Sequence, residues 1–159
     1  MSRVLYVIVC AAVEAGDVGR LVGMAQADGW LVQIVATPSA LDFIDVQALA
    51  EQTGRPVRSQ YRKSHEPKPP RADAIVVAAA TFNTINKFAL GITDTYALGL
   101  LAEAPGLGIP VVVLPFVNSA LASRAPFRNS VESLKQEGVR IIFGADDPWR
   151  PALDALAEP

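Results

Sequence analysis

The sequence predicts an α/β fold in which a parallel sheet forms the middle layer of a three-layer sandwich. Four apolar runs rich in β-branched residues recur along the chain, and each is continuous, which is typical of strands covered on both faces. Segments with helical spacing separate these runs. The repeated β–α–β order favours parallel strands joined by crossover helices on both faces of the sheet.

The individual elements follow from the same pattern. The apolar runs place strands at residues 3–10, 30–37, 73–80 and 109–116, with a weaker fifth at 139–144. Helical spacing marks residues 17–29 and 129–138, among others, and both segments close on a glycine just before the next strand. We therefore expect a single domain over residues 1–159 with a Rossmann-like (flavodoxin-like) sheet. In such sheets, ligands bind outside the carboxyl ends of the strands.

The composition argues against several classes of protein. Hydrophobic residues make up 51% of the 159 residues and the formal net charge is −2, whereas nucleic-acid binders usually carry a basic excess. No apolar run approaches the roughly 20 residues needed to cross a bilayer. A single cysteine leaves no internal disulfide and no cysteine-based metal site. We expect a cytoplasmic protein without a metal, a membrane span or a nucleic-acid partner.

Residues 55–71, RPVRSQYRKSHEPKPPR, differ from the rest of the chain. They hold six of the fourteen Lys and Arg residues, four prolines and the single histidine. Proline at this density discourages both helix and central strand. Two interpretations stay open, a mobile solvated connector and a basic flap that attracts an anionic substrate.

Polar side chains are concentrated directly after the third strand. The segment AATFNTINKFALGITDT, residues 79–95, contains two asparagines, four threonines, a lysine and an aspartate. A solvated turn needs only two or three such residues, and this segment starts at the strand end where ligands bind in parallel sheets. Its polar density is typical of a binding site.

Together with the preceding Ala72-Asp73 and strand, this segment resembles the FMN-binding block of the FMN-dependent cysteine decarboxylases. That flavoprotein family includes phosphopantothenoylcysteine decarboxylase and the lantibiotic-peptide decarboxylases. Its block reads Ala-Asp, an apolar strand, Pro-Ala-Ser/Thr-Ala-Asn-Thr, a lysine and Gly-Ile-x-Asp, and the match runs without a gap to Asp94. The whole resemblance covers roughly residues 3–143. It implies an FMN site formed by Thr81, Asn83, Thr84, Lys87 and Asp94.

The chemistry of these residues suits a flavin. The Asn83 amide both donates and accepts hydrogen bonds, and the hydroxyls of Thr81 and Thr84 do either, as the polar ring edge requires. An alternative is that Asn83 and Thr84 only cap the following helix. Asp94 has its own alternative, as a residue at the start of a helix.

Two further matches imply catalytic residues. In LPFVNSALASRAP, Pro115 and Asn118 match the family's Pro-Ala-Met-Asn-x-x-Met-Trp, whose asparagine contacts the substrate carboxylate. His65 precedes Ala72 by seven positions, the spacing expected for the family's catalytic base, and histidine titrates near neutral pH. The alternatives are a turn or helix cap for Asn118 and an exposed loop histidine for His65.

Several departures from the family bear on function. The phosphate-binding Gly-Ser turn falls at Ala11-Ala12, followed by Glu14 and Asp17, whose carboxylates would repel a phosphate if they pointed at it. Ser39, or Arg124 of a neighbouring subunit, could hold the phosphate instead. The substrate motif has other residues at four positions, which are Phe116, Val117, Leu121 and Ala122.

The family's carboxyl-terminal Gly-rich clamp and its reducing cysteine are also missing. Cys10 cannot replace that cysteine by position, because it ends the first strand, where a small core residue is expected.

The resemblance implies an FMN-binding flavoprotein that oxidatively decarboxylates a small-molecule or peptide thiol derived from cysteine. The departures leave a catalytically silent relative, serving as a regulatory or structural subunit, as the alternative. A non-flavin nucleotide binder would rest on the fold alone. The resemblance also implies a homo-oligomer, a trimer or a dodecamer assembled from trimers, and the mean hydropathy of +0.29 agrees with apolar surface buried between subunits.

Overall fold

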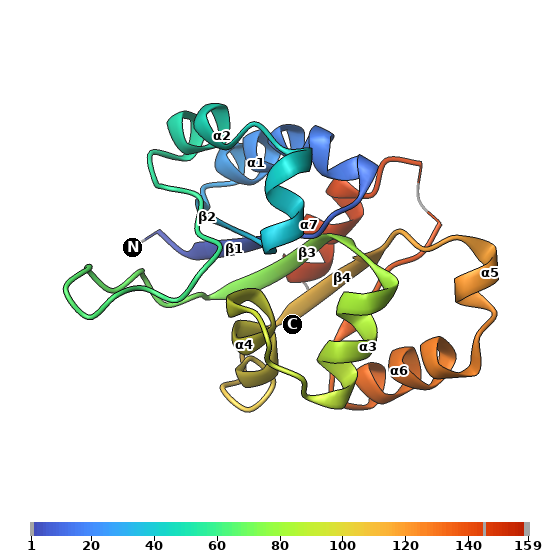
Figure 1. Cartoon of the computed structure of the whole chain (residues 1–159). Coiled ribbons are helices and arrows are strands. Elements are labelled where there is room, and N and C mark those ends of the chain that lie inside the picture. Colours follow the sequence, from blue (N-terminus) through green and yellow to red (C-terminus); the bar gives the residue numbers. More distant parts are fainter. Residues whose placement is uncertain (1, 145, 158–159) are drawn as a thin grey trace.

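The computed structural model describes residues 2–144 and 146–157. Within them, five parallel strands form one sheet in the order β2-β1-β3-β4-β5 (Figure 1). The strands are β1 Val4–Val9, β2 Leu31–Ala36, β3 Ala74–Ala80, β4 Val111–Pro115 and β5 Arg140–Ile141. Each lies inside the run that predicted it, so the parallel α/β sheet is confirmed. The order is that of flavodoxin-like folds, with the topological switch point between β1 and β3.

Helices connect the strands. The α-helices are α1 Val18–Ala27, α2 Val46–Thr53, α3 Phe82–Leu90, α4 Tyr96–Glu103, α5 Ser119–Ala122, α6 Ala125–Gln136 and α7 Trp149–Ala157, and the short 3₁₀ helices are η1 Val13–Asp17 and η2 Pro38–Phe43. The two predicted helices correspond to α1 and α6, although α6 begins four residues earlier than its pattern. Gly29 and Gly138 follow them with φ of 92° and 89°, a conformation that glycine adopts without a steric penalty.

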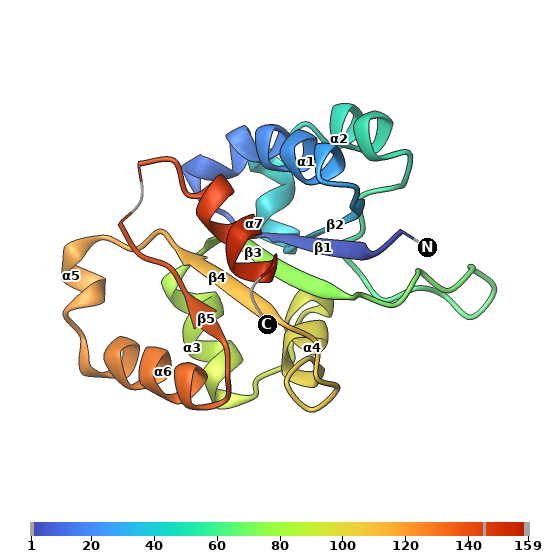
Figure 2. The same cartoon turned by 180° about the vertical axis from the view of Figure 1, so that it is seen from behind.

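The helices cover both faces of the sheet (Figures 1 and 2). On one face, Leu5 and Val7 of β1 pack in a core with Leu21 of α1 and Leu153 of α7. On the other face, Ile8 belongs to a second core with residues of α3, α4 and α6. Because successive side chains of a strand point to opposite faces, a continuous apolar strand supplies both cores.

The basic segment 55–71 is held at both of its ends. Its first part pairs with the edge of β2, where the Ala36 amide donates to the Arg58 carbonyl over 2.7 Å. At its other end the Tyr6 hydroxyl donates to the Pro70 carbonyl. Between these anchors, the Tyr61 ring packs edge-on against Tyr96 of α4, with centroids 5.1 Å apart.

That ring contact requires a glycine on α4. A Cβ atom at Gly99 would overlap the Tyr61 hydroxyl, so only the bare backbone lets the loop lie this close to the helix. The part of the loop between its two anchored ends projects past the amino-terminal ends of the strands, beside the start of the chain (Figures 1 and 2).

Candidate functional site

A cavity of about 400 Å³ lies where β1, β2 and β3 end, and we call it the threonine cavity. Its lining residues are Cys10, Ala11, Thr37, Pro38, Ser39, Thr81, Asn83, Thr84, Lys87, Thr95 and Leu98. Five of the six predicted cofactor residues are among them, all except Asp94. The cavity adjoins the switch point of the sheet, where ligands bind in open α/β folds.

Thr81 and Thr84 are tied to each other. Thr81 is the N-cap of α3, and its hydroxyl oxygen accepts a hydrogen bond from the Thr84 amide over 3.2 Å. The Thr81 hydroxyl also donates to the Thr84 hydroxyl over 3.0 Å. Thr84 is only 5% exposed and lies against the Cys10 thiol, whose pKa is raised by burial. These two threonines therefore build the wall of the cavity.

Asn83 and Ser39 have side chains that are free to meet a ligand. Both are exposed, and neither side chain has a hydrogen-bond partner within residues 2–144 and 146–157. Since Thr81 performs the capping, the helix-cap interpretation is wrong for the Asn83 side chain. An amide and a hydroxyl thus reach this cavity with their bonding capacity unused.

Lys87 and Asp94 form an ion pair at the end of the cavity. The ammonium of Lys87 lies 2.5 Å from a carboxylate oxygen of Asp94. Among the described lining residues Lys87 alone is charged. Asp94 reaches the cavity through this contact, and it partly offsets the positive charge that an anionic ligand would meet.

A second cavity, of about 420 Å³, lies where β4 and β5 end, and we call it the Glu14–Asn118 cavity. Its lining residues are Glu14, Leu114, Pro115, Phe116, Val117, Asn118, Ile142, Gly144 and Pro148. Asn118 caps the short helix α5, with Oδ1 accepting from the Leu121 amide over 2.9 Å. The capping interpretation is therefore correct, but it uses only the oxygen. The NH₂ group of Asn118 has no described partner and can donate to a ligand.

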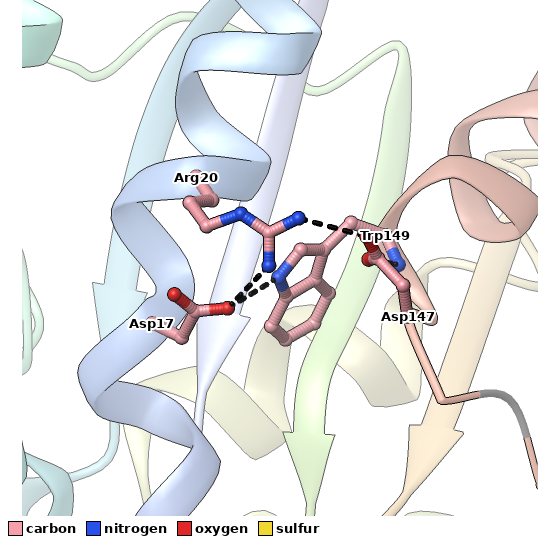
Figure 3. Close-up of polar contacts among 4 residues, drawn as sticks. All are labelled: Asp17, Arg20, Asp147 and Trp149. Atoms are coloured by element: carbon pink, nitrogen blue, oxygen red, sulfur yellow. Dashed lines mark hydrogen bonds and ion pairs between the residues drawn. The ribbon is translucent and has the colours of Figure 1, made fainter.

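The turn after β1 separates the two cavities. Ala11 lines the threonine cavity, whereas Glu14 lines the Glu14–Asn118 cavity. The carboxylate of Asp17 accepts hydrogen bonds from Arg20 over 2.9 Å and from the indole nitrogen of Trp149 over 3.0 Å (Figure 3). Asp17 is thereby engaged with α1 and α7, and neither of the two carboxylates lines the threonine cavity.

His65 is exposed and lies in the projecting part of the basic loop. That part points away from the strand ends that line both cavities (Figure 1). The chain therefore does not bring His65 together with Asn83 or Asn118. Arg124, the other residue considered for a phosphate, is exposed beside a groove between α3 and α6.

Two threonines that line the threonine cavity were not predicted as site residues. Thr37 follows β2 directly and its hydroxyl accepts from the Ala40 amide, and Thr95 caps α4 by accepting from the Leu98 amide. In the sequence, each threonine stands immediately before a helical segment, which is the signal of an N-cap. An N-cap residue at the carboxyl end of the sheet lies on the side where ligands bind. An N-cap signal combined with this position could have identified Thr37 and Thr95.

The described part of the chain contains neither a candidate metal site nor a candidate membrane span. Across residues 2–144 and 146–157, no group of three or more His, Cys, Asp or Glu side chains is arranged to hold a metal ion. Within the same residues, no helix has the length and apolar character needed to span a membrane.

Comparison with known proteins gives relatives of the same fold. The chain is 30% identical over 120 residues to the coenzyme A biosynthesis bifunctional protein CoaBC of Thermococcus kodakarensis, which covers 70% of this chain and 29% of that protein. The chain thus spans less than a third of the length of this curated relative. A solved structure of TvaF, described as an FMN-dependent cysteine decarboxylase from thioviridamide biosynthesis, superimposes with a TM-score of 0.83 at 24% identity, covering 99% of this chain and all of that one.

A second solved structure, a PPC decarboxylase mutant complexed with pantothenoylaminoethenethiol, has a TM-score of 0.76 at 22% identity. It covers 89% of this chain and 82% of that chain. At these identities the superpositions establish the shared fold. The profile of the Flavoprotein family matches residues 2–157, which is nearly the whole chain. With that match, the sheet order and the polar strand ends, the chain belongs to the Flavoprotein family.

Proposed function

We propose that this protein binds FMN in the threonine cavity and oxidatively decarboxylates a small-molecule or peptide thiol derived from cysteine. The observation that carries the proposal is the unused amide of Asn83 in a cavity at the switch point of the sheet. The structurally similar TvaF, described as an FMN-dependent cysteine decarboxylase, gives the reaction class.

The residues present fit an FMN group. The cavity volume of about 400 Å³ lies in the usual range for cofactor sites. Asn83 offers a donor and an acceptor for the ring edge, and the apolar Leu98 supplies part of the floor. The hydroxyl of Ser39 and the ammonium of Lys87 are the groups suited to a phosphate. Ala11 leaves the backbone of the first turn open to such a ligand, and the nearby carboxylate of Asp17 is held by Arg20.

In the proposed reaction the cofactor would accept the electrons, and residues of the chain would orient the substrate and transfer a proton. When bound, FMN would supply the acceptor for two electrons from the Cβ–S unit of the substrate, whose C–H and S–H bonds give way to a C=S bond. The free NH₂ group of Asn118 would orient the substrate carboxylate, and His65 would accept the thiol proton. Loss of carbon dioxide then leaves an enethiol.

His65 would serve the cavity of a neighbouring subunit. Within one chain its loop projects away from the carboxyl ends of the strands (Figure 2), and those ends line both cavities, so a second copy is needed to bring the imidazole to Asn118. Large apolar side chains remain exposed on the monomer, among them Leu90 at 73% and Phe143 at 51%. Burial of such side chains favours a homo-oligomer, for which we propose a trimer or a dodecamer assembled from trimers.

Two observations favour the second candidate, a catalytically silent relative. The ion pair with Asp94 offsets the charge of Lys87, and Ala12 offers no hydroxyl to a phosphate. Both features weaken anion binding at the cavity. Such a protein would bind flavin weakly and act as a regulatory or structural subunit.

Fluorescence titration of FMN with purified protein tests the proposal. Binding should quench the flavin, and Asn83→Ala should weaken it by about 1–3 kcal/mol because a buried polar group of the ring loses its partner. Asn129→Ala, an exposed amide on α6 outside the threonine cavity, should leave binding unchanged. Absence of quenching at high protein concentration would support the silent relative.

A further inference from the structure

Glu14 is a carboxylate with no hydrogen-bond or ion-pair partner among the described residues, and it lies in a cavity lined by both polar and apolar surface. It lines the Glu14–Asn118 cavity beside Leu114, Phe116, Val117 and Ile142, and its exposure is intermediate. Among the described residues that line this cavity, Glu14 is the only charged one. The nearest arginine on α1, Arg20, already bonds Asp17 and Asp147 (Figure 3).

A carboxylate in such a place selects its ligand by charge. A ligand that covers Glu14 removes water from it, and an unpaired carboxylate is strongly disfavoured in an apolar environment. An acylated nitrogen on the ligand brings no positive charge to offset the negative charge of Glu14. A second carboxylate on the ligand would be repelled by Glu14. An ammonium group offsets the charge and donates short, charge-assisted hydrogen bonds.

Asn118 completes the pattern on the same cavity. Its Oδ1 is used to cap α5, so only the two hydrogens of its NH₂ group face a ligand. Donors of this kind suit a carboxylate. The cavity thus offers an acceptor with negative charge and a neutral donor pair, which together match the ammonium and the carboxylate of an amino acid.

We infer that the Glu14–Asn118 cavity takes a substrate with a free ammonium group, and that Glu14 determines this specificity. The inference rests on the proposed function in that this cavity is the substrate site. It restricts the substrate class to unacylated aminothiol acids, the small-molecule part of the class proposed above. Substrates whose cysteine nitrogen is acylated are disfavoured.

Calorimetric titration with two matched probes tests the inference. S-methyl-L-cysteine carries the ammonium, and N-acetyl-S-methyl-L-cysteine replaces it by an amide. Neither has a thiol, so turnover cannot obscure binding. The wild-type protein should prefer the amine by about tenfold, the factor that corresponds to about 1.4 kcal/mol. Equal binding of the two probes, or no binding of the amine at millimolar concentration, would overturn the inference.

Matched variants separate charge from structure. Glu14→Gln keeps the shape and removes the charge, so the preference for the amine should disappear. Glu103→Gln, an exposed carboxylate at the end of α4, should retain it. Persistence of the preference in Glu14→Gln, with thermal unfolding unchanged, would place the selectivity elsewhere.

The titrations are run with and without FMN, and flavin fluorescence is recorded separately. If FMN fails to bind while the Glu14-dependent preference persists, the proposed function fails and the inference stands. If FMN binds and the two probes bind equally, the inference fails and the flavin assignment stands.

Discussion

The indole nitrogen of Trp149 and the Nη1 atom of Arg20 donate to the same carboxylate oxygen of Asp17, over 3.0 and 2.9 Å (Figure 3). Arg20 also bonds Asp147 over 2.7 Å. The contacts connect α7 to the start of α1, and Pro148, directly before Trp149, lines the Glu14–Asn118 cavity. This cluster therefore holds one wall of the candidate substrate site.

Replacing Trp149 should separate the hydrogen bond from the packing. Trp149→Phe keeps a buried ring but loses the donor, and we expect a loss of about 1 kcal/mol in the free energy of unfolding. Trp149→Ala also leaves a cavity and should lose about 3–5 kcal/mol. Urea denaturation measures both. Trp30→Phe, at a buried indole packed under Arg3, is the matched control for ring size. Equal losses for the two Phe variants would assign no special role to Asp17.

Tyr6 should make the protein sensitive to alkali. Burial raises its pKa to about 12 from the ordinary 10.0, and its hydroxyl donates to the Pro70 carbonyl. The folded state therefore holds this proton more tightly than the unfolded state, so the associated stability is complete below pH 10 and is lost as the pH rises through about 12. Urea denaturation at several pH values should show this decline.

Two tyrosine variants test the assignment to Tyr6. Tyr6→Phe should flatten the decline above pH 10 and lower stability at neutral pH by about 1 kcal/mol, because the Pro70 carbonyl loses its donor. Tyr61→Phe, at a ring that is 65% exposed, should leave the alkaline decline in place. An unchanged decline in Tyr6→Phe would point to another group.

Asp94→Asn should tighten FMN binding. The substitution removes the carboxylate that pairs with Lys87 and leaves the ammonium free to meet a phosphate. Since the pair is partly exposed, we expect a gain of about 0.5–1 kcal/mol that fades at high salt. Titrations at low and high ionic strength check this, with Glu103→Gln as the control for net charge. Weaker binding by Asp94→Asn would instead make Asp94 a direct contact of the cofactor.

Mixing two inactive variants tests whether the site is shared between subunits. His65→Asn and Asn118→Ala should each abolish turnover while FMN binding persists. After unfolding and refolding together, mixed oligomers should regain about a quarter of the wild-type activity, because random assembly pairs an intact His65 with an intact Asn118 at that fraction of interfaces. No recovery in oligomers shown to be mixed would place both residues in one chain or remove one of them from the mechanism.

The sequence was sufficient for the strands and for the polar edge of the sheet, because both arise from local patterns. Continuous apolar runs place all five strands, and the polar residues after β3 do converge with Ser39 at one cavity. Local sequence patterns did not predict which polar side chains pair with one another. The bond between Asp17 and Trp149 spans 132 positions, and only the packing of α7 on α1 creates it.

The sequence also did not show which of several neighbouring polar residues caps a helix and which faces a cavity. Thr81 caps α3, which leaves the Asn83 side chain free, although both residues fit the N-cap preference. Glu14 would repel a cofactor phosphate only if its carboxylate pointed at it, and it lines the Glu14–Asn118 cavity rather than the threonine cavity. Two residues separate Ala11 from Glu14, and the start of η1 at Val13 directs the two side chains to different cavities.

The position of α7 has a consequence for biosynthesis. The Glu14–Asn118 cavity needs Gly144 and Pro148, which a ribosome adds after every other residue of its lining. A nascent chain that has already made β1 to β4 and the whole threonine cavity still lacks that wall. Under the proposed function, cofactor capture would precede substrate capture during synthesis, and flavin that enters early would stabilise the nascent chain while the proposed substrate cavity is still open.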